Sequence, residues 1–375
     1  MIRRHRNAST RLAIRWLAPV LVSVLAGALA AAVLPAGAAT RSLPAGSLPA
    51  GSAGSSWTLR LAIQYLPPAT NHSQYIVTVV EPGEVWFLGG SDVGGHGHPV
   101  AERMINGIPH AVSLPSGPHS WITAASALSP QDIWAVTALG GSVLTWNGSA
   151  WAVVAPRGAW KPGTRFTGIT ALSPTDVWVF GTASTRYPGA GTWHWNGTAW
   201  SQVTGIAGGI FQASKASPTD VWAVGEAGGT MSALLHRGGK TWQRVRPAAL
   251  AGFTYSRVLA LAPRNVWVAG WLAGSPELGH FDGTSWTALT MTGSVAATGL
   301  CPDGRGGLWV IANTGKSPSR LLHRSAAGTW TTALVRSSAA YEIFGCATIP
   351  GTTVTWAAGK AMAPQGSAAA AYRHG

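Results

Sequence analysis

Charged residues, cysteines and helical patterns are scarce in this sequence. Aspartate, glutamate, lysine and arginine together make up 10% of the 375 residues, whereas typical soluble domains contain roughly 25%. The two cysteines leave room for one disulfide at most. No part of the repeated region described below has helical periodicity, which excludes a helical fold there. An apolar content of 46% excludes a chain that is disordered over most of its length.

Acidic residues are the scarcer charged type. Twelve Asp and Glu stand against 26 Lys and Arg, which gives a formal net charge of +14. This balance favours anionic partners, although a simple solubility bias would produce it too. Glycoside hydrolases generally need two carboxylates about 5–10 Å apart, and the acids here show no pairing motif. Five aspartates fall in predicted turns and are therefore expected to be structural: Asp132, Asp176, Asp220, Asp282 and Asp303. Few acids remain for catalysis, so the sequence favours a protein that is not an enzyme without deciding the question.

The N-terminal region has the three parts of a secretory signal. Residues 1–16 are rich in arginine, residues 17–34 are apolar and uncharged, and small residues follow up to Ala39. We predict a signal peptide over 1–39, with an uncleaved membrane anchor as the alternative. Residues 40–55 form a Pro/Gly/Ser-rich linker. The protein is therefore expected to be secreted, or anchored and facing outside, with membrane contact only through an uncleaved segment.

Glycine and tryptophan are abundant, with 48 and 20 copies, and seven of the tryptophans define an internal repeat. Two of them end the same phrase, SPTDVW, at Trp178 and Trp222, and SPQDIW ends at Trp134. Weaker copies end at Trp86, Trp267, Trp309 and Trp356, so that successive spacings run from 42 to 48 residues. A period near 45 is typical of the four-stranded blades of β-propellers.

Each repeat carries four short strand patterns, and tight-turn pairs such as Asn147-Gly148 separate the last two. We therefore predict an all-β chain that forms one seven-bladed β-propeller over residues 56–375. The seventh repeat ends before its fourth strand. The strand that begins near Ser55 and carries Trp57 has the missing pattern, and we expect it to close the ring by pairing into the seventh blade.

The repeated motifs resemble those of secreted bacterial propellers of the kelch/galactose-oxidase and Asp-box (sialidase-like) groups. The DVWAVG strand is similar to the kelch strand that ends in two glycines, and Gly89-Gly90 keeps both. The Gly-Lys-Thr-Trp run at 239–242 is similar to the end of an Asp-box, but Arg237 stands where that box has aspartate. The resemblance implies the fold and carries over no activity, because propellers host unrelated functions.

Most conspicuous side chains have a place in the repeat and are expected to be structural. A second tryptophan follows the tight turn in five repeats, Trp57 fits the sixth such place, and the first repeat has His110 there. Four histidines share one position on the third strand: His194, His236, His280 and His323. We expect each to form a hydrogen bond within its own blade, for example to the aspartate of the turn. His96 and His98 lack a third metal ligand, so neither a metal nor a cofactor is predicted.

The two cysteines, Cys301 and Cys346, lie near the ends of first strands in adjacent repeats. Export favours oxidation, so we predict a disulfide between them. The alternative is a pair of buried thiols that lie too far apart to bridge.

The connections between the second and third strands, and between blades, vary in length and share one face of the predicted propeller. They are rich in basic and aromatic residues, which can bind carboxylates, phosphates and sugar rings. We predict an extracellular binding module for anionic glycan or cell-envelope polymer, and a monomer that does not bind nucleic acid. The alternatives are an ordinary solvated face and a carbohydrate-active hydrolase or lyase with a sialidase-like propeller. The candidate binding residues are Trp160, Lys161, Arg165, Arg186, Tyr187, Tyr255, Arg257 and Trp271.

Overall fold

The computed structural model describes most of the chain from Ser56 onward, within one compact unit, Thr40–Gly375. The predicted signal segment 1–39 and the linker 40–55 lie outside the described residues. No helix of the described part has the length and apolar character needed to cross a membrane. The described ranges are 56–63, 71–81, 83–93, 96–116, 120–138, 141–155, 160, 165–181, 191–204, 206, 209–227, 230–291, 297–312, 318–337, 340–363 and 366–375.

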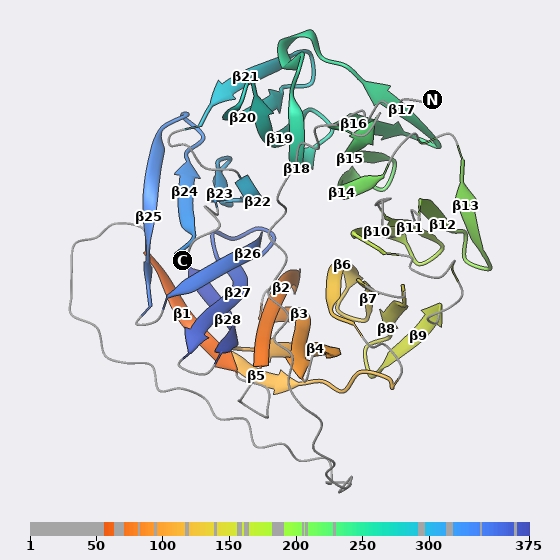
Figure 1. Cartoon of the computed structure of the whole chain (residues 1–375), viewed down its shortest axis with the longest axis vertical. Helices are drawn as coiled ribbons and strands as arrows, with labels where there is room; N and C mark the ends of the chain where they lie inside the picture. Colours follow the sequence, from red (N-terminus) through yellow and green to blue (C-terminus); the bar gives the residue numbers. More distant parts are fainter. Residues whose placement is uncertain are drawn as a thin grey trace, which may run out of the picture. The chain divides into compact units, whose positions relative to one another are not determined.

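Short antiparallel strands make up nearly all of the described regular structure, and four of the sheets are separate four-stranded units. Their strands follow chain order from the centre of the ring outward (Figure 1). The bounds are β6 (Ile122–Ser129), β7 (Asp132–Thr137), β8 (Val143–Trp146), β9 (Trp151–Ala155), β10 (Gly168–Ser173), β11 (Asp176–Phe180), β12 (Thr192–Trp195), β13 (Trp200–Val203), β14 (Ile210–Ser217), β15 (Asp220–Ala227), β16 (Thr230–Gly238), β17 (Thr241–Val245), β18 (Thr254–Ala262), β19 (Asn265–Leu272), β20 (Ser275–Phe281) and β21 (Trp286–Thr290). A 3₁₀ turn, η2 (Ala248–Leu250), lies between β17 and β18.

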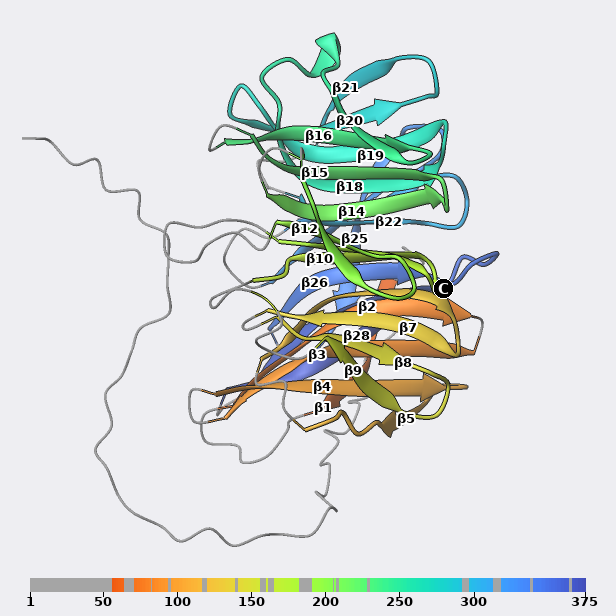
Figure 2. The same ribbon diagram turned by 90° about the vertical axis from the view of Figure 1, so that its right-hand side faces the viewer.

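The remaining strands join into one 12-stranded sheet, whose main path runs β22-β23-β24-β25-β1-β28-β2-β3-β4-β5, with β26 and β27 attached at β28. Seen from the side, the strands of the sheets run from one face of the ring to the other (Figure 2). The bounds are β1 (Ser56–Ile63), β2 (Asn71–Glu81), β3 (Glu84–Val93), β4 (His96–Ile105), β5 (Ile108–Ala111), β22 (Ala297–Pro302), β23 (Leu308–Ala312), β24 (Arg320–Arg324), β25 (Trp330–Arg336), β26 (Tyr341–Thr348), β27 (Thr355–Ala363) and β28 (Gly366–His374).

Tryptophans fill the spaces between neighbouring sheets. Each repeat tryptophan lies on the second strand of its repeat, and the exposed fraction is at most 6%, at Trp356. The tryptophan after the tight turn packs edge-on against the second-strand tryptophan of the preceding repeat, with ring centroids 5.2–5.7 Å apart. Four such pairs are Trp151 with Trp86, Trp242 with Trp178, Trp286 with Trp222, and Trp57 with Trp309. Burial of these large apolar rings is the main source of contact between sheets.

The glycine that follows the DVW motif allows a close approach between strands. A Cβ atom built on Gly270 would lie 1.9 Å from the carbonyl oxygen of Thr254, and one on Gly359 would lie 1.9 Å from that of Glu342. The first strand of each of these repeats has a bulge at this point, and the bulge brings its carbonyl against the second strand. The repeated glycine is therefore a steric requirement of the sheet.

The N-terminal strand pairs with the last strand of the chain, as predicted. Thr58 of β1 lies opposite Arg373 of β28 in an antiparallel ladder, and Ser56 pairs with Leu334 of β25 in parallel. Trp57 is fully buried against Trp309. The two ends of the described chain thus share one sheet, which leaves neither as an exposed edge there.

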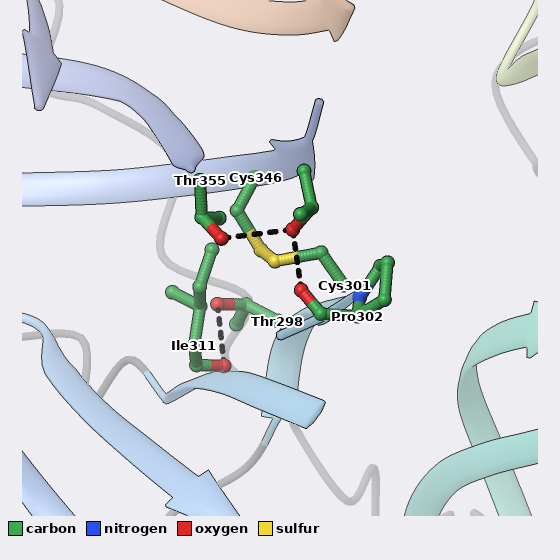
Figure 3. The surroundings of a disulfide bond; sticks show 7 residues. Thr298, Cys301, Pro302, Ile311, Cys346 and Thr355 are labelled. Atoms are coloured by element: carbon green, nitrogen blue, oxygen red, sulfur yellow. Dashed lines mark hydrogen bonds between the residues drawn. A yellow bond between two sulfur atoms is a disulfide. The ribbon is translucent and has the colours of Figure 1, made fainter. Parts of the chain in front are cut away.

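The predicted disulfide is confirmed and joins β22 to β26 (Figure 3). The Cα atoms of Cys301 and Cys346 lie 5.8 Å apart, within the range that a disulfide spans. The Thr348 hydroxyl donates a hydrogen bond to the carbonyl oxygen of Pro302 and lies 2.8 Å from the Thr355 hydroxyl. Covalent and hydrogen-bonded links therefore hold the innermost strands of two neighbouring repeats together.

Candidate functional site

The face that carries the variable connections is described in part. Among the predicted binding residues, Lys161, Arg186 and Tyr187 lie outside the described residues. The longest fully described connection on this face is residues 246–253, between β17 and β18. The site is therefore built around this segment and its neighbours.

A hollow of about 520 Å³ runs along the 246–253 connection. One wall comes from β16 and β17, with the exposed Arg244, and the other from the connection itself, with the exposed Arg246. The Nη2 atom of Arg244 donates to the carbonyl oxygen of Ser232 at 3.3 Å. Among the described residues that line it there is neither aspartate nor glutamate. The hollow therefore offers two guanidinium groups and hydroxyl groups to an anion.

Tyr255 lies at the inner end of this hollow, but it is 4% exposed. Burial, partly offset by the nearby charge of Arg244, raises the pKa of Tyr255 to about 12. Trp271 is half-buried in the same hairpin, because Thr254 pairs with Trp271 and Tyr255 with Gly270. Because side chains of successive residues in a strand point to opposite faces, Trp271 and Tyr255 lie on different faces of this hairpin, and Trp271 is the more accessible of the two.

Arg257 faces a different space, a hollow of about 280 Å³ on the axis of the ring. First strands or their leading residues from several repeats line it, and Arg257 is the one charged side chain among the lining residues that the structure describes. Its Nε donates to the carbonyl oxygen of Thr298 and its Nη1 to that of Ser256. Burial lowers the pKa of Arg257. Two of its nitrogens thus bond the backbone.

Trp160 is packed inside the fold, which removes its ring from the exposed surface. It is 7% exposed, its ring meets Phe166 and Trp193 edge-on at 5.2 and 4.6 Å, and its indole N–H donates to the carbonyl oxygen of Gly141 at 2.7 Å. Stacking of a sugar on this ring would require that packing to open. Arg165, in contrast, is exposed just before β10.

The repeated histidines bond within their own sheets, as predicted. His194 lies 2.9 Å from Asp176, His236 lies 3.2 Å from Asp220, and His323 lies 2.8 Å from Asp303. His280 uses Asn265 instead of an aspartate, at 3.0 Å. Each ring also packs on the second-strand tryptophan of its repeat, with centroids 4.0–4.5 Å apart.

Histidine partners and turn amides also occupy several of the acidic side chains. The backbone amides of Thr284 and Ser285 bond Asp282 and lower the pKa of this exposed carboxyl. Asp303 accepts the amides of Arg305 and Gly307 besides its histidine. Over the described residues, no three His, Cys, Asp or Glu side chains gather closely enough to hold a metal ion. The hydrolase alternative therefore finds no support in this acid arrangement.

Lys215 makes polar contacts that the sequence pattern did not predict. It occupies the first-strand position of Ala127 and Ala171, and its ammonium group donates to the carbonyl oxygens of those two residues at 3.4 and 2.8 Å. Burial lowers the pKa of Lys215, against the attraction of Asp132. The signal was a lysine where other repeats have alanine. Its bonds identify it as a tie between three repeats.

Comparisons with known proteins agree on the fold. The sequence matches no protein family model and no curated protein. Among solved structures, YCF48 with a bound peptide has a TM-score of 0.58 at 13% identity, covering 88% of this chain and 99% of that chain. An inactive virginiamycin B lyase from Staphylococcus aureus gives 0.56 at 11% identity, covering 84% and 99%. The WD40 repeats of RRP9 give 0.57 at 9% identity, covering 81% and 94%. At these identities the similarity shows a β-propeller fold alone.

Proposed function

We propose that this chain is an extracellular, non-catalytic binding module for anionic glycan or cell-envelope polymer. The observation that supports the proposal is the hollow along residues 246–253, which Arg244 and Arg246 line and whose described lining contains no carboxylate. Guanidinium groups bind carboxylates and phosphates through paired hydrogen bonds. A cross-link between Cys301 and Cys346 is consistent with an oxidising compartment outside the cell.

The architecture that we propose for the module is a seven-bladed propeller of the secreted bacterial type. In this interpretation the 12-stranded sheet comprises three four-stranded blades: β2–β5, β22–β25, and β26–β28 completed by β1. The strand pairing between these blades is short and parallel, with three residue pairs between β1 and β25 and two between β2 and β28. Every other neighbour in that sheet pairs antiparallel, as within the four separate sheets.

Binding of the purified chain to immobilised polyanions tests the function. We would use polygalacturonate for carboxylates and poly(glycerol phosphate) for phosphates, each at 50 and 300 mM salt. Binding should weaken with salt, because exposed charges are screened. The double variant Arg244→Gln, Arg246→Gln should bind at least about tenfold more weakly, because each charge-assisted bond contributes roughly 1.5–3 kcal/mol.

The matched control is Arg264→Gln, which removes an exposed arginine from the turn between β18 and β19 on the opposite face. It lowers the net charge without touching the hollow, so its affinity should stay within about twofold of the unmodified chain. Equal losses in the control and the double variant would mean that binding depends on net charge alone. That result, or no binding to either polymer at low salt, would refute the proposal.

A further inference from the structure

The third strand of most repeats places a basic side chain over the repeat tryptophan, next to an acceptor. For His194, His236 and His280 the acceptor is the aspartate or asparagine two residues before that tryptophan. His323 instead bonds Asp303, which lies six residues before Trp309. In the first repeat, Arg103 lies opposite Trp86 and bonds Glu84 at 2.7 Å. Glu84 also accepts the indole N–H of Trp86 at 2.8 Å. The second repeat has the uncharged Thr145 in this position.

The last repeat keeps the base and loses the acceptor. Arg373 lies opposite Trp356, but the residue two before this tryptophan is Val354. Over the described residues, the guanidinium group of Arg373 has neither an ion pair nor a hydrogen bond, and the same holds for the exposed Arg60. Arg60 is the extra residue of a bulge between Leu59 and Leu61 in β1, a feature that redirects a side chain.

A second departure from the repeat pattern lies beside the first. Where the first repeat meets the last, no tryptophan follows the tight turn to pack between the two. The turn of the first repeat has two residues, Asn106 and Gly107, both with positive φ, so that Ile105 pairs directly with Ile108. Ile108 points outward and is 61% exposed. The apolar cluster around Trp356 includes Val85, Phe87 and Met104, but it contains no residue of β5.

The two departures leave a hollow of about 630 Å³ over Trp356. Its apolar lining is Val85, Met104, Ile349, Val354 and Trp356, and its charged lining is Arg60 and Arg373. The acid of the first repeat, Glu84, is 6% exposed and is paired with Arg103. Turn residues Gly83, Asn106 and Thr352 also line the space, which places it on the face opposite the 246–253 connection.

We propose that this hollow binds an aromatic carboxylate. The aromatic ring would lie in the hollow against the side chains of Val85, Met104 and Val354, beside the buried Trp356. Other repeats place a tryptophan at the corresponding position. The carboxylate would pair with Arg373 and Arg60, in place of the acid that other repeats supply. Free aromatic acids and chains that end in an aromatic residue both have this chemistry. The site is independent of the polymer-binding function proposed above.

Isothermal titration calorimetry of the purified chain tests the site with two probes. Indole-3-acetate represents the free acid, and an acetylated Gly-Gly-Trp peptide with a free carboxylate represents the chain end. The amide of the same peptide and acetate are the controls that lack the carboxylate and the ring. We expect binding of at least one probe and no binding of either control, and the tighter probe identifies the source.

Two variants locate the binding. Arg373→Gln removes the unpaired charge, and Val354→Asp restores the acceptor found in other repeats, so that Arg373 is paired internally. Both should weaken the bound probe by about tenfold or more, while Arg244→Gln, Arg246→Gln should leave it unchanged. The proposal is overturned if neither probe binds at 1 mM, if the amide binds as well as the acid, or if both variants, shown to be folded by circular dichroism, retain full affinity.

Discussion

Replacement of Trp57 tests whether the N-terminal strand holds the ring closed. A buried tryptophan removes about 200 Å² of largely apolar surface from water, which is worth about 5 kcal/mol at 25 cal/mol per Å². The indole N–H of Trp57 is buried without a hydrogen-bond partner, and its removal relieves about 1–2 kcal/mol. We therefore expect Trp57→Ala to lower the free energy of unfolding by about 3–4 kcal/mol.

Trp57→Phe makes the estimate sharper, because it keeps a ring against Trp309 and removes the unpaired N–H. It should cost less than about 1.5 kcal/mol. Urea unfolding followed by circular dichroism gives both values, with Ile108→Ala at a 61% exposed position as the control. A loss below about 1 kcal/mol in Trp57→Ala would refute the reasoning, since β1 would then contribute little to closure.

Three further predictions concern the scaffold. Replacement of both cysteines by serine should cost about 4 kcal/mol in urea unfolding, because the disulfide closes a loop of 45 residues in the unfolded chain; an unchanged midpoint would contradict this. Gly270→Ala should destabilise the fold by more than about 2 kcal/mol, since its Cβ would meet the Thr254 carbonyl oxygen at 1.9 Å, whereas Gly345→Ala, at a position with open space around the added Cβ, should cost less. Burial, with the nearby charge of Arg324, lowers the pKa of His280, and burial likewise lowers the pKa of His374. The unfolded chain therefore takes up protons first as pH falls through about 6.5, so the Tm should be lower at pH 5.5 than at pH 7.5, and His280→Gln should reduce that difference.

The sequence predicted the features that recur in every repeat, because each repeat must form the same four strands and pack against its neighbours in the same way. The DVW tryptophan and the third-strand histidine recur at corresponding positions of the repeats, so the histidines were expected to bond within each blade, as His194 bonds Asp176. The same alignment assigned Trp57 to the vacant place of the last repeat. It also set Cys301 and Cys346 on first strands of adjacent repeats, and the structure shows that their Cα atoms are 5.8 Å apart, close enough to bridge.

Features of single connections could not be predicted in this way. Trp160 has no counterpart in other repeats, so its burial depends on contacts with Phe166 and Trp193 that no pattern announces. His110 occupies the place of a tryptophan when residues are counted from the turn, but the two-residue turn places Ile108 opposite Ile105 instead. The depth of Tyr255 likewise follows from the path of the 246–253 connection.

Departures from a repeat are informative because the other repeats act as internal controls. If the contact between the first and last repeats were only structural, we would expect a tryptophan to pack between them, since apolar burial holds the other sheets together. It would also be expected to keep an acceptor beside Arg373, as Glu84 stands beside Arg103. The tryptophan and the acceptor are both missing at this one contact between repeats. An explanation for the missing tryptophan alone would not explain the missing acceptor. A ligand that brings its own ring and its own carboxylate accounts for both with one requirement.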